Sequence, residues 1–442
     1  MKVVADLEVH SKYARAVSSS MTIPIIAEWS EKKGIGLVGT GDFTHPMWLR
    51  ELEANLEEAE SGVFQLRKSQ IPISKSKYND VRFLLTSEVS CMYTHEGRGR
   101  RVHMMIFLPS FDSVKKFNQG LTSFGANLFS DGRPIMGLTL TQVAEIALEV
   151  TEKALIIPAH VWTPWFGFYG SMSGYDTLTE GFGDLEKKIP AMETGLSSDP
   201  AMNWRIAELT NKRIVSFGDA HSPQKLGREA TVFELEELSY DAIGRALWGK
   251  GPEEIAYTIE FYPEEGKYHY TGHRKCNIVY SPNDARRLGL TCPVCGRPLT
   301  IGVMSRVETL ASVDSETTAE TDKFGVRWVK DSKGIRSPYV MLVPLLEIIA
   351  ETLNLGVGSQ KVMELYELLI NQFGNEFSVL LKTPFDDIKR FGGQRVSETV
   401  QKVRSGDIVI EPGFDGVFGT VKIWREGEDL IKETQVDQTS LF

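Results

Sequence analysis

The chain has 442 residues, and its hydrophobic content of 42% is typical of a globular protein large enough to bury more than one core. Its net charge of −10 argues against a generally basic nucleic-acid binder, although local basic patches are not excluded. No apolar run approaches the roughly 18 residues of a membrane span, and the N-terminus lacks a signal-peptide pattern, so we expect a cytoplasmic protein without membrane contact.

From the N-terminus to about residue 234, short apolar runs alternate with longer amphipathic runs. The short runs are rich in β-branched residues and predict strands, and the longer runs predict helices. The predicted strands cover 2–6, 36–39, 82–86, 103–108, 154–158 and 214–217. The predicted helices include 22–33, 46–60, 140–151 and 200–210. This order predicts an α/β fold of parallel strand–helix–strand units, whose ligands gather at the carboxyl ends of the strands.

Side chains able to bind metals stand at or beside one end of each predicted strand. They are Glu8 and His10, Asp42 and His45, Glu88, His103, His160, and Asp219 and His221, with Glu193 as a weaker candidate. One such residue beside a strand is more often a hydrogen-bonded or helix-capping residue than a ligand. Because such residues recur at the ends of several strands in one domain, we prefer the interpretation that they bind metal. The mixture of carboxylates with imidazoles favours a carboxylate-bridged multinuclear site over a single structural zinc.

This series of motifs resembles the PHP (polymerase and histidinol phosphatase) superfamily. The resemblance implies a distorted (β/α)7 PHP barrel that holds two or three divalent ions, Mg, Mn or Zn, for phosphoester hydrolysis. It implies that the metal ligands are Glu8, His10, Asp42, His45, Glu88, His103, His160, Asp219 and His221, with Glu88, Asp219 and His221 as catalytic residues. Glu8 replaces the usual histidine of the first motif, and a carboxylate there favours Mn, Mg or Fe. In the second motif either Asp42 or His45 can be the ligand, and Asp42 is in the better position.

Three longer stretches, at 5–16, 39–46 and 219–230, resemble the endonuclease Q family, and the resemblance extends over about residues 3 to 424. It implies a cytoplasmic, nucleoid-associated DNA repair enzyme that nicks DNA on the 5′ side of uracil, hypoxanthine and xanthine, and at abasic sites. Divalent cations would bind the scissile phosphate, lower the pKa of a water and stabilise the leaving 3′ oxygen. Two alternatives stay open: a PHP phosphoesterase that acts on small phosphate monoesters, and a DNA-binding scaffold that has lost its barrel metals.

A loop rich in aromatic residues follows His160. A lesion-specific nuclease must extrude the damaged base, and exposed rings can stack on that base or fill the gap that it leaves. We expect contacts with DNA or the base from Trp162, Trp165, Phe168, Tyr169, Ser171 and, in a glycine-broken loop, Arg101. The alternatives are that the rings only cover the top of the barrel and that the arginine is a solvated charge.

A second group of metal-capable residues lies in the segment 241–305, which we interpret as a linker and a zinc-binding module. The group consists of His273, Cys276, Cys292 and Cys295. A Cys-x-x-Cys pair chelates from one turn, so this spacing predicts one tetrahedral structural zinc. A redox role for Cys292 and Cys295 is the alternative, but no thioredoxin-like unit surrounds them. We expect the module to orient DNA.

The segment 306–424 is expected to form a helical DNA-contacting domain, following the catalytic barrel at 1–240 and the zinc module. Helices at 344–353 and 361–372 flank a Gly-x-Gly turn, which resembles a helix-hairpin-helix that binds a DNA phosphate; an ordinary αα-hairpin is the alternative. The charged tail at 425–442 lacks periodicity, and we expect it to be flexible. Its end, Gln438 to Phe442, resembles a short sliding-clamp-binding peptide.

Overall fold

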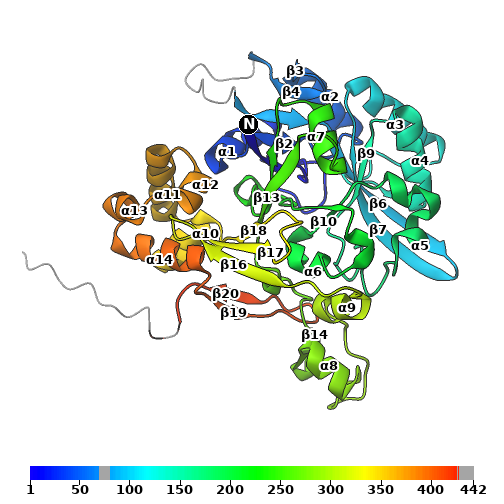
Figure 1. Cartoon of the computed structure of the whole chain (residues 1–442). Coiled ribbons are helices and arrows are strands. Elements are labelled where there is room, and N and C mark those ends of the chain that lie inside the picture. The colour runs from blue at the N-terminus through cyan, green and yellow to red at the C-terminus, as the bar shows by residue number, and fades with distance from the viewer. Residues whose placement is uncertain (69–79, 426, 428–442) are drawn as a thin grey trace, which may run out of the picture.

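The computed structural model describes residues 1–68, 80–425 and 427, and its largest element is a ten-stranded mixed sheet (Figure 1). In spatial order the strands are β16 (Thr317–Thr321), β17 (Arg327–Asp331), β18 (Tyr339–Met341), β13 (Glu254–Glu260), β12 (Ala230–Glu234), β1 (Lys2–Asp6), β2 (Leu37–Gly39), β5 (Arg82–Leu84), β4 (Val63–Leu66) and β3 (Leu56–Glu60). Strands β1, β2 and β5 are parallel, with Ala5 opposite Leu37 and Leu37 opposite Arg82. Within these described ranges, no helix is long and apolar enough to cross a membrane.

Two smaller sheets contain the strands that follow β5 along the chain. Strands β8 (Ile135–Met136), β6 (Thr86–His95), β7 (Arg98–Phe107) and β9 (Leu155–Pro158) form one sheet, and β10 (Ala191–Glu193) and β11 (Arg213–Val215) form the other. Backbone hydrogen bonds from Val161 to Glu193 and from His10 to Ala220 join the segments that follow these strands. The chain segments beyond β1, β9, β10 and β11 therefore converge on one region.

A buried apolar cluster shows that these strands enclose a common core. It takes residues from strands of all three sheets, including Ala5, Leu37, Phe107, Ile157 and Val215. Because successive side chains of a strand point to opposite faces, the alternate residues of the same strands pack outward against the surrounding helices. These helices include α1 (Ile23–Lys33), α2 (Pro46–Asn55), α3 (Phe111–Ser123), α4 (Leu140–Val150) and α5 (Leu178–Phe182). Helix α7 (Tyr240–Trp248) packs against the enclosed cluster itself.

Local sequence explains where two of the covering helices begin. Ser110 accepts a hydrogen bond from the Ser113 amide at the start of α3, and Thr139 accepts one from the Gln142 amide at the start of α4. In each case the side chain at the third helical position returns a bond to the capping residue, which completes a capping box. Helix α3 has no counterpart among the predicted elements.

The structure corrects three of the predicted elements. The helix expected at 46–60 ends at Asn55, because Leu56 to Glu60 form β3 and pair with β4. The helix expected at 200–210 is reduced to the single turn α6 (Pro200–Asn203) followed by a 3-10 turn at Ala207–Leu209. The strands are not all parallel, since β7 is antiparallel to both β6 and β9. His103 consequently lies in the middle of a long hairpin strand and not at its opening. In the first case, a hairpin with the adjacent strand β4 overrides the local helical pattern. In the third case, the hairpin with β6 and the pairing with the more distant β9 set the direction of β7.

The helical segment of the C-terminal region forms a separate group at one side of the molecule (Figure 1). It contains α10 (Leu345–Leu353), α11 (Gln360–Phe373), α12 (Glu376–Leu381), α13 (Phe385–Gly392) and α14 (Gln394–Ser405). A buried ion pair between Lys33 and Glu376, 2.7 Å long, fixes this group to α1. Strand β18, which precedes it, pairs with β13, and β13 pairs with β12. The main sheet therefore runs across the predicted boundaries near residues 240 and 305.

The predicted zinc module projects from the rest of the molecule (Figure 1). It contains the hairpin of β14 (Thr271–His273) and β15 (Ile278–Tyr280), followed by α8 (Pro282–Leu288). Helix α9 (Val303–Leu310) connects it to the body, and the hairpin of β19 (Val409–Glu411) and β20 (Thr420–Lys422) lies beside its base. The proposed clamp peptide, Gln438 to Phe442, lies outside the described residues.

Candidate metal centre

Seven of the nine side chains expected to bind metals in the barrel converge where the strands end. They fall into three overlapping groups: His10, Asp219 and His221; Glu88, His103 and His160; and Glu8, Glu88 and Asp219. Within each group the ligand atoms lie within 4.8 Å of one another. Side chains from β6, β7 and the segments after β1, β9 and β11 thus meet at one point, although up to 213 positions separate them along the chain.

Glu88 lies at the centre of the cluster and is shared by two of the groups. Its Oε2 is 3.0 Å from His10 Nε2, and its Oε1 is 2.5 Å from His103 Nδ1 and 3.1 Å from His160 Nε2. His10 Nε2 also lies 3.2 Å from Asp219 Oδ1. A carboxylate that faces several imidazole nitrogens at these distances has the arrangement of a bridging metal ligand.

Glu8 gives the clearest sign that the cluster suits cations. Its side chain is buried, with 2% exposed, and neither carboxylate oxygen accepts a hydrogen bond from any residue that the structure describes. Burial, together with the charges of Glu193, Asp219 and Glu88, raises its pKa well above the ordinary value. An unpaired buried carboxylate beside other carboxylates is costly, and a divalent cation would remove that cost. The donor set of carboxylates and imidazoles fits Mg, Mn, Fe or Zn.

Asp42 stands behind the cluster and orients one of its members. Its Oδ1 faces His10 Nδ1 at 3.0 Å, and its Oδ2 accepts hydrogen bonds of 2.6 Å from both the amide and the hydroxyl of Ser11. With Nδ1 engaged, the Nε2 atom of His10 is directed at Glu88 and Asp219. Metal-binding histidines commonly have such a carboxylate on the far ring nitrogen. The structure therefore places Asp42 outside the groups that we expected it to join.

His45 is also not in the cluster. Its ring stacks on Tyr13, with 4.5 Å between centroids, and Phe129 lies against it at 6.1 Å. Burial lowers its pKa, so the ring is neutral at physiological pH. The second predicted motif thus contributes an orienting carboxylate and a stacked ring to the site.

The charged groups of the cluster shift one another's pKa values. Burial would raise the pKa of Asp219, but the hydrogen bond from His10 and the charges of His10 and His221 hold it well below the ordinary value. Burial lowers the pKa of His103 to about 4 in spite of the nearby Glu88 carboxylate. Burial would also lower the pKa values of His10 and His160, but the neighbouring carboxylates outweigh it and raise both. Metal ligation requires ionised carboxylates and neutral imidazoles, so a metal would displace a proton from these two rings.

Backbone geometry at the strand ends is set by two buried carboxylates. Asp6 accepts hydrogen bonds of 2.8 Å from the amides of Gly218 and Gly227, and so fixes the turn that carries Asp219, whose φ is 43°. Glu193 accepts from the amides of His160 and Phe217. Burial raises the pKa of both carboxyls to about 7. Both residues support the cluster through the backbone, which is a different role from direct ligation.

Arg133 is a site residue that the sequence did not indicate. Its guanidinium Nη1 lies 2.9 Å from Glu88 Oε2, and a quarter of its side chain, 26%, is exposed. It belongs to a Gly-Arg-Pro turn before β8, and the pairing of β8 with β6 brings it to the cluster. A partly exposed cation beside a metal cluster can bind a phosphate oxygen. The only sequence signal was an arginine in a turn, which is too common to single out.

The aromatic loop divides into buried and accessible rings, and this corrects part of the prediction. Trp162, Phe168 and Tyr169 are fully buried. The indole of Trp162 donates to Asn203 at 2.8 Å, and the hydroxyl of Tyr169 donates to Glu208 at 2.6 Å. These three rings are core residues, because a flipped base cannot reach a side chain with no exposed surface.

Other predicted contact residues remain at the surface. Trp165 is half-buried and meets Tyr268, with 5.2 Å between ring centroids. Arg101 is exposed, with its guanidinium 6.0 Å from the Phe166 ring. Ser171 donates its hydroxyl to the Ile301 carbonyl at 3.1 Å, which links the aromatic loop to the segment before α9.

The second metal-capable group assembles as the spacing predicted. The ligand atoms of His273, Cys276, Cys292 and Cys295 lie within 4.8 Å of one another, with His273 Nδ1 3.5 Å from Cys295 Sγ. Burial would raise the pKa of Cys292, but backbone amides at Cys295 and Val294 outweigh it and lower the pKa to about 6. Three thiols and one imidazole at this separation fit one tetrahedral zinc.

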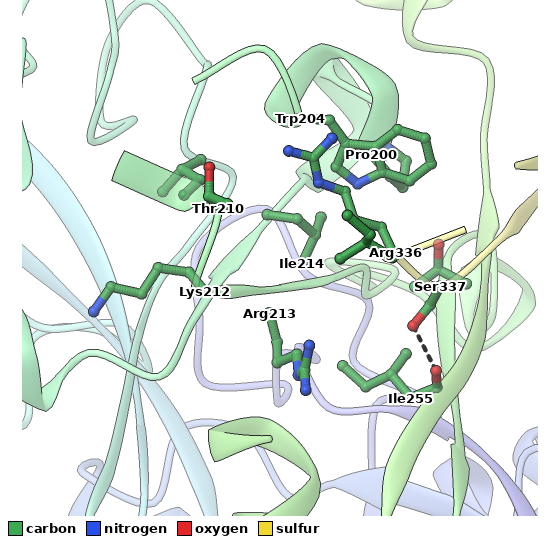
Figure 2. Close-up of a pocket in the computed structure, with 12 residues that line it drawn as sticks. Pro200, Trp204, Thr210, Lys212, Arg213, Ile214, Ile255, Arg336 and Ser337 are labelled. Carbon is green, nitrogen blue, oxygen red and sulfur yellow. Dashed lines mark hydrogen bonds between the residues drawn. The ribbon is translucent and has the colours of Figure 1, made fainter. Parts of the chain in front are cut away.

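A pocket of about 50 Å³ lies near the start of β11, at the end of the strand away from Asp219 (Figure 2). Its lining includes Trp204, Lys212, Arg213 and Arg336, and Figure 2 shows the Ser337 hydroxyl bonded to the Ile255 carbonyl, at 2.6 Å. The lining contains no member of the metal-capable groups. It is therefore separate from the candidate metal centre.

Comparison with known proteins agrees with this architecture. The chain is 34% identical to a lesion-specific endonuclease, PfuEndoQ from Pyrococcus furiosus, whose crystal structure it matches with a TM-score of 0.79 over 97% of this chain and 98% of that one. It also matches an endonuclease Q solved in complex with a 27-mer duplex that has an abasic lesion at the active site, with 34% identity, a TM-score of 0.80 and coverage of 98% and 99%.

Two further matches involve a protein of unknown role. The family described as MJ0043 C-terminal domain matches residues 344–407, which contain helices α10 to α14. The uncharacterised protein MJ0043 of Methanocaldococcus jannaschii is 34% identical over 280 residues, or 62% of this chain. The match spans about a third, 32%, of the length of that protein.

The fold and the cluster at its strand ends place the chain in the class of metal-dependent nucleases that act on DNA lesions. Within this class, the chain shares more than 30% identity with endonuclease Q structures and matches them over nearly the full length of both chains. The chain belongs to the endonuclease Q family.

Proposed function

We propose that this protein hydrolyses the DNA phosphodiester on the 5′ side of deaminated bases, namely uracil, hypoxanthine and xanthine, and at abasic sites. The observation that carries the proposal is the buried cluster around Glu88, within a chain that matches lesion-specific endonucleases over nearly its whole length. DNA is the partner that this family membership supports.

We further propose that the strands from β1 to β11 correspond to the distorted (β/α)7 PHP barrel, with 1–240 as the catalytic part. The enclosed apolar core and the convergence of the segments after the strands support this interpretation. On the same proposal, 241–305 contains the structural zinc module and 306–424 the DNA-contacting part.

Two or three divalent ions held by the seven converging side chains would activate water and neutralise charge on the scissile phosphate. Glu8, His10 and Glu88 are buried, while Asp219 and His221 have 24% and 33% of their side chains exposed. The phosphate would therefore approach from the side of Asp219 and His221. Arg133, which is partly exposed and contacts Glu88, is placed to bind a phosphate oxygen on that side.

Charge supports the proposed path of DNA. The segment 267–297 contains six Lys and Arg residues and a single acidic residue, Asp284, although the whole chain has a net charge of −10. This segment includes the zinc module. A local positive surface on an acidic protein indicates where the phosphates of DNA bind.

The central test incubates the protein and Mg or Mn with end-labelled duplexes that contain uracil, hypoxanthine, xanthine, an abasic site or no lesion. We expect one cut on the 5′ side of each lesion and none in the undamaged duplex. A protein that cuts no lesion, or that cuts all duplexes alike, would contradict the proposal. A parallel assay with a chromogenic phosphate monoester separates this activity from a general phosphoesterase.

We also propose that Gln438 to Phe442 binds a sliding clamp. The support is the sequence pattern alone, a glutamine followed by two apolar anchors. Calorimetry with a synthetic peptide of these residues and a sliding clamp, with Leu441 and Phe442 both changed to alanine as the control, tests this proposal. Equal heats for both peptides would contradict it.

A further inference from the structure

The turn that connects β19 to β20 presents an apolar tip to solvent. Phe418 has 71% of its surface exposed and Val417 has 41%. An exposed phenylalanine beside an exposed valine on a protein surface often marks a contact site. The tip is therefore a candidate contact site.

This turn is held rigidly against the segment that leads into the zinc module. The Gly413 amide donates to the Glu264 carbonyl at 2.8 Å, and the Gly419 amide donates to the Glu265 carbonyl at 3.0 Å. A Cβ on Gly419 would lie 2.1 Å from the Glu264 carbonyl oxygen, so only glycine permits this approach. The position of Phe418 is thus fixed by backbone bonds that do not involve its own ring.

A continuous series of contacts connects Phe418 with the metal centre. The Phe166 ring lies 4.5 Å from the His103 ring, and its neighbour Trp165 meets Tyr268 at 5.2 Å. Lys267, next to Tyr268, has its ammonium 5.8 Å from the Tyr268 ring and 5.5 Å from the Phe418 ring. All of these side chains except His103 are exposed or half-buried. The accessible aromatic surface therefore extends from the metal cluster to the tip of the turn.

Two exposed cations lie beside the turn. The Lys267 ammonium is 5.5 Å from the Phe418 ring, and Arg274 has its guanidinium beside Gly416 and donates its amide to Asp415. Cations around an exposed aromatic residue match nucleic acid, whose phosphates bind the charges while its bases stack on the ring. The same chemistry does not suit an apolar protein partner, because that partner would leave the cations without counter-charges.

We propose that Phe418 enters the base stack of the duplex at the lesion and fills the space of the extruded nucleotide, while Lys267 binds an adjacent phosphate. This inference rests on the proposed function, and it assigns the gap-filling role to a residue 249 positions beyond the end of the aromatic loop at Tyr169. Apolar side chains that enter a step of DNA in this way stabilise the distorted duplex. Trp162, Phe168 and Tyr169 are too deeply buried to do so.

The test compares three variants of the full-length protein on matched substrates. Phe418→Ala removes the ring, Phe418→Trp retains an aromatic surface, and Phe124→Ala removes an exposed ring, 58% exposed, at the end of α3. Each variant is assayed on a uracil-containing duplex and on the same strand without its complement. Unstacking is followed separately by the fluorescence of 2-aminopurine placed opposite the lesion.

We expect Phe418→Ala to lower kcat/KM on the duplex by roughly tenfold to a hundredfold, the value of one base–aromatic stack, and to leave the single strand unchanged. Phe418→Trp restores the duplex rate, and Phe124→Ala behaves as the unchanged protein. A loss of equal size on both substrates, no loss on either, or the same duplex-specific loss in Phe129→Ala and not in Phe418→Ala would overturn the assignment. Phe129 is the competing exposed ring, 67% exposed, beside His45.

The fluorescence measurement separates this inference from the proposed function. A protein that unstacks 2-aminopurine through Phe418 without cutting any lesion would contradict the proposed nuclease activity and support the gap-filling role. A protein that cuts lesions while Phe418→Ala gives the full fluorescence change would support the activity and contradict the role of the ring.

Discussion

The two metal-capable regions of this chain differ in chemistry, depth and assembly. The barrel cluster combines carboxylates with imidazoles, and its members range from Glu8 to His221. The second group offers three cysteines and one histidine within His273 to Cys295, and Cys295 is exposed. The first region exists only when strands of three sheets come together, and the second needs little more than a hairpin and one turn.

On our proposal, this difference would separate two uses of metal. Several carboxylates in one buried cluster repel one another without cations, so the first cluster would bind metal and substrate through these charges. Thiolates and an imidazole complete a closed tetrahedral shell and leave no open position for substrate. Loss of the barrel metals should remove chemistry and preserve shape, whereas loss of the zinc should remove local shape and preserve chemistry.

The largest expected effect is on the barrel side of this comparison. Asp219→Asn keeps the shape of the side chain and tolerates the positive φ at this position, but removes the charge from the ligand atom. We expect nicking of a uracil duplex to fall by roughly a hundredfold or more, because a metal contact stabilises the transition state by several kcal/mol. Affinity for the duplex should change little. Single-turnover rates and fluorescence anisotropy measure the two quantities.

Asp112→Asn, at an exposed position in the first turn of α3, is the matched control. Full nicking activity in Asp219→Asn would show that the metal centre lies elsewhere.

Cys292→Ser tests the second region of the comparison, the predicted zinc site. We expect the protein to lose one equivalent of zinc and to bind the lesion duplex roughly tenfold more weakly, because the module loses its fixed shape. Its rate at saturating DNA should persist, since the barrel ligands are unchanged. Metal content is measured by mass spectrometry and affinity by anisotropy.

Cys91→Ala changes a buried thiol outside the module and should retain the zinc. Unchanged zinc content in Cys292→Ser would remove Cys292 from the ligand set.

Glu8→His sharpens the comparison within the barrel. The change replaces a hard carboxylate by an imidazole in the first of the predicted metal-binding motifs. We expect the ratio of activity with Zn to activity with Mn to increase by roughly tenfold, since imidazole favours zinc more than manganese. Activity titrations with each metal check this ratio. An unchanged ratio in Glu8→His, with Glu8→Gln equally unchanged, would mean that residue 8 does not touch a metal.

The smallest expected effect concerns a buried carboxyl below the cluster that has no metal role in our proposal. Glu260 is fully buried, and its Oε1 accepts a hydrogen bond of 2.6 Å from Ser216. Burial raises its pKa from 4.5 to about 8. Because the folded-state pKa lies above the unfolded value, the folded protein loses stability as pH rises from about 4.5 to about 8.

Glu260→Gln removes this titration. The Tm of the unchanged protein should fall more between pH 6 and pH 8.5 than that of the variant, by roughly 1–3 °C. Thermal unfolding at the two pH values measures the difference. Parallel pH profiles for the two proteins would show that the carboxyl keeps its ordinary pKa.

The sequence predicted the parts of the site that local pattern determines. Strands β1, β2, β9 and β11 are confirmed, because each is a short apolar run with a strand end marked by polar residues. Most members of the cluster lie just beyond the ends of these strands, which is why the sequence pattern predicted them. The membership in the endonuclease Q family is also confirmed.

The parts that were missed depend on strand pairing, both between neighbouring and between distant segments. Arg133 reaches Glu88 only because β8 pairs with β6, and β3 exists only because β4 is beside it. Asp42 has the residue type of a ligand, and only the position of His10 shows that it orients a ring. Burial of Trp162, Phe168 and Tyr169 results from packing between α5, α6 and the loop, which an aromatic-rich sequence does not reveal. Residue type and spacing thus predict chemistry better than orientation or exposure.

The ten-stranded sheet has a consequence for where the enzyme cuts. Strand β1 leads directly to Glu8 and His10, and the same sheet continues through β12 and β13 to β18, which precedes the C-terminal helices. A continuous hydrogen-bonded sheet is stiffer than a flexible linker. On our proposal that 306–424 contacts the duplex, the sheet would hold that surface at a set distance from the cluster around Glu88. The position of the nick should then follow from this distance and not from the identity of the damaged base.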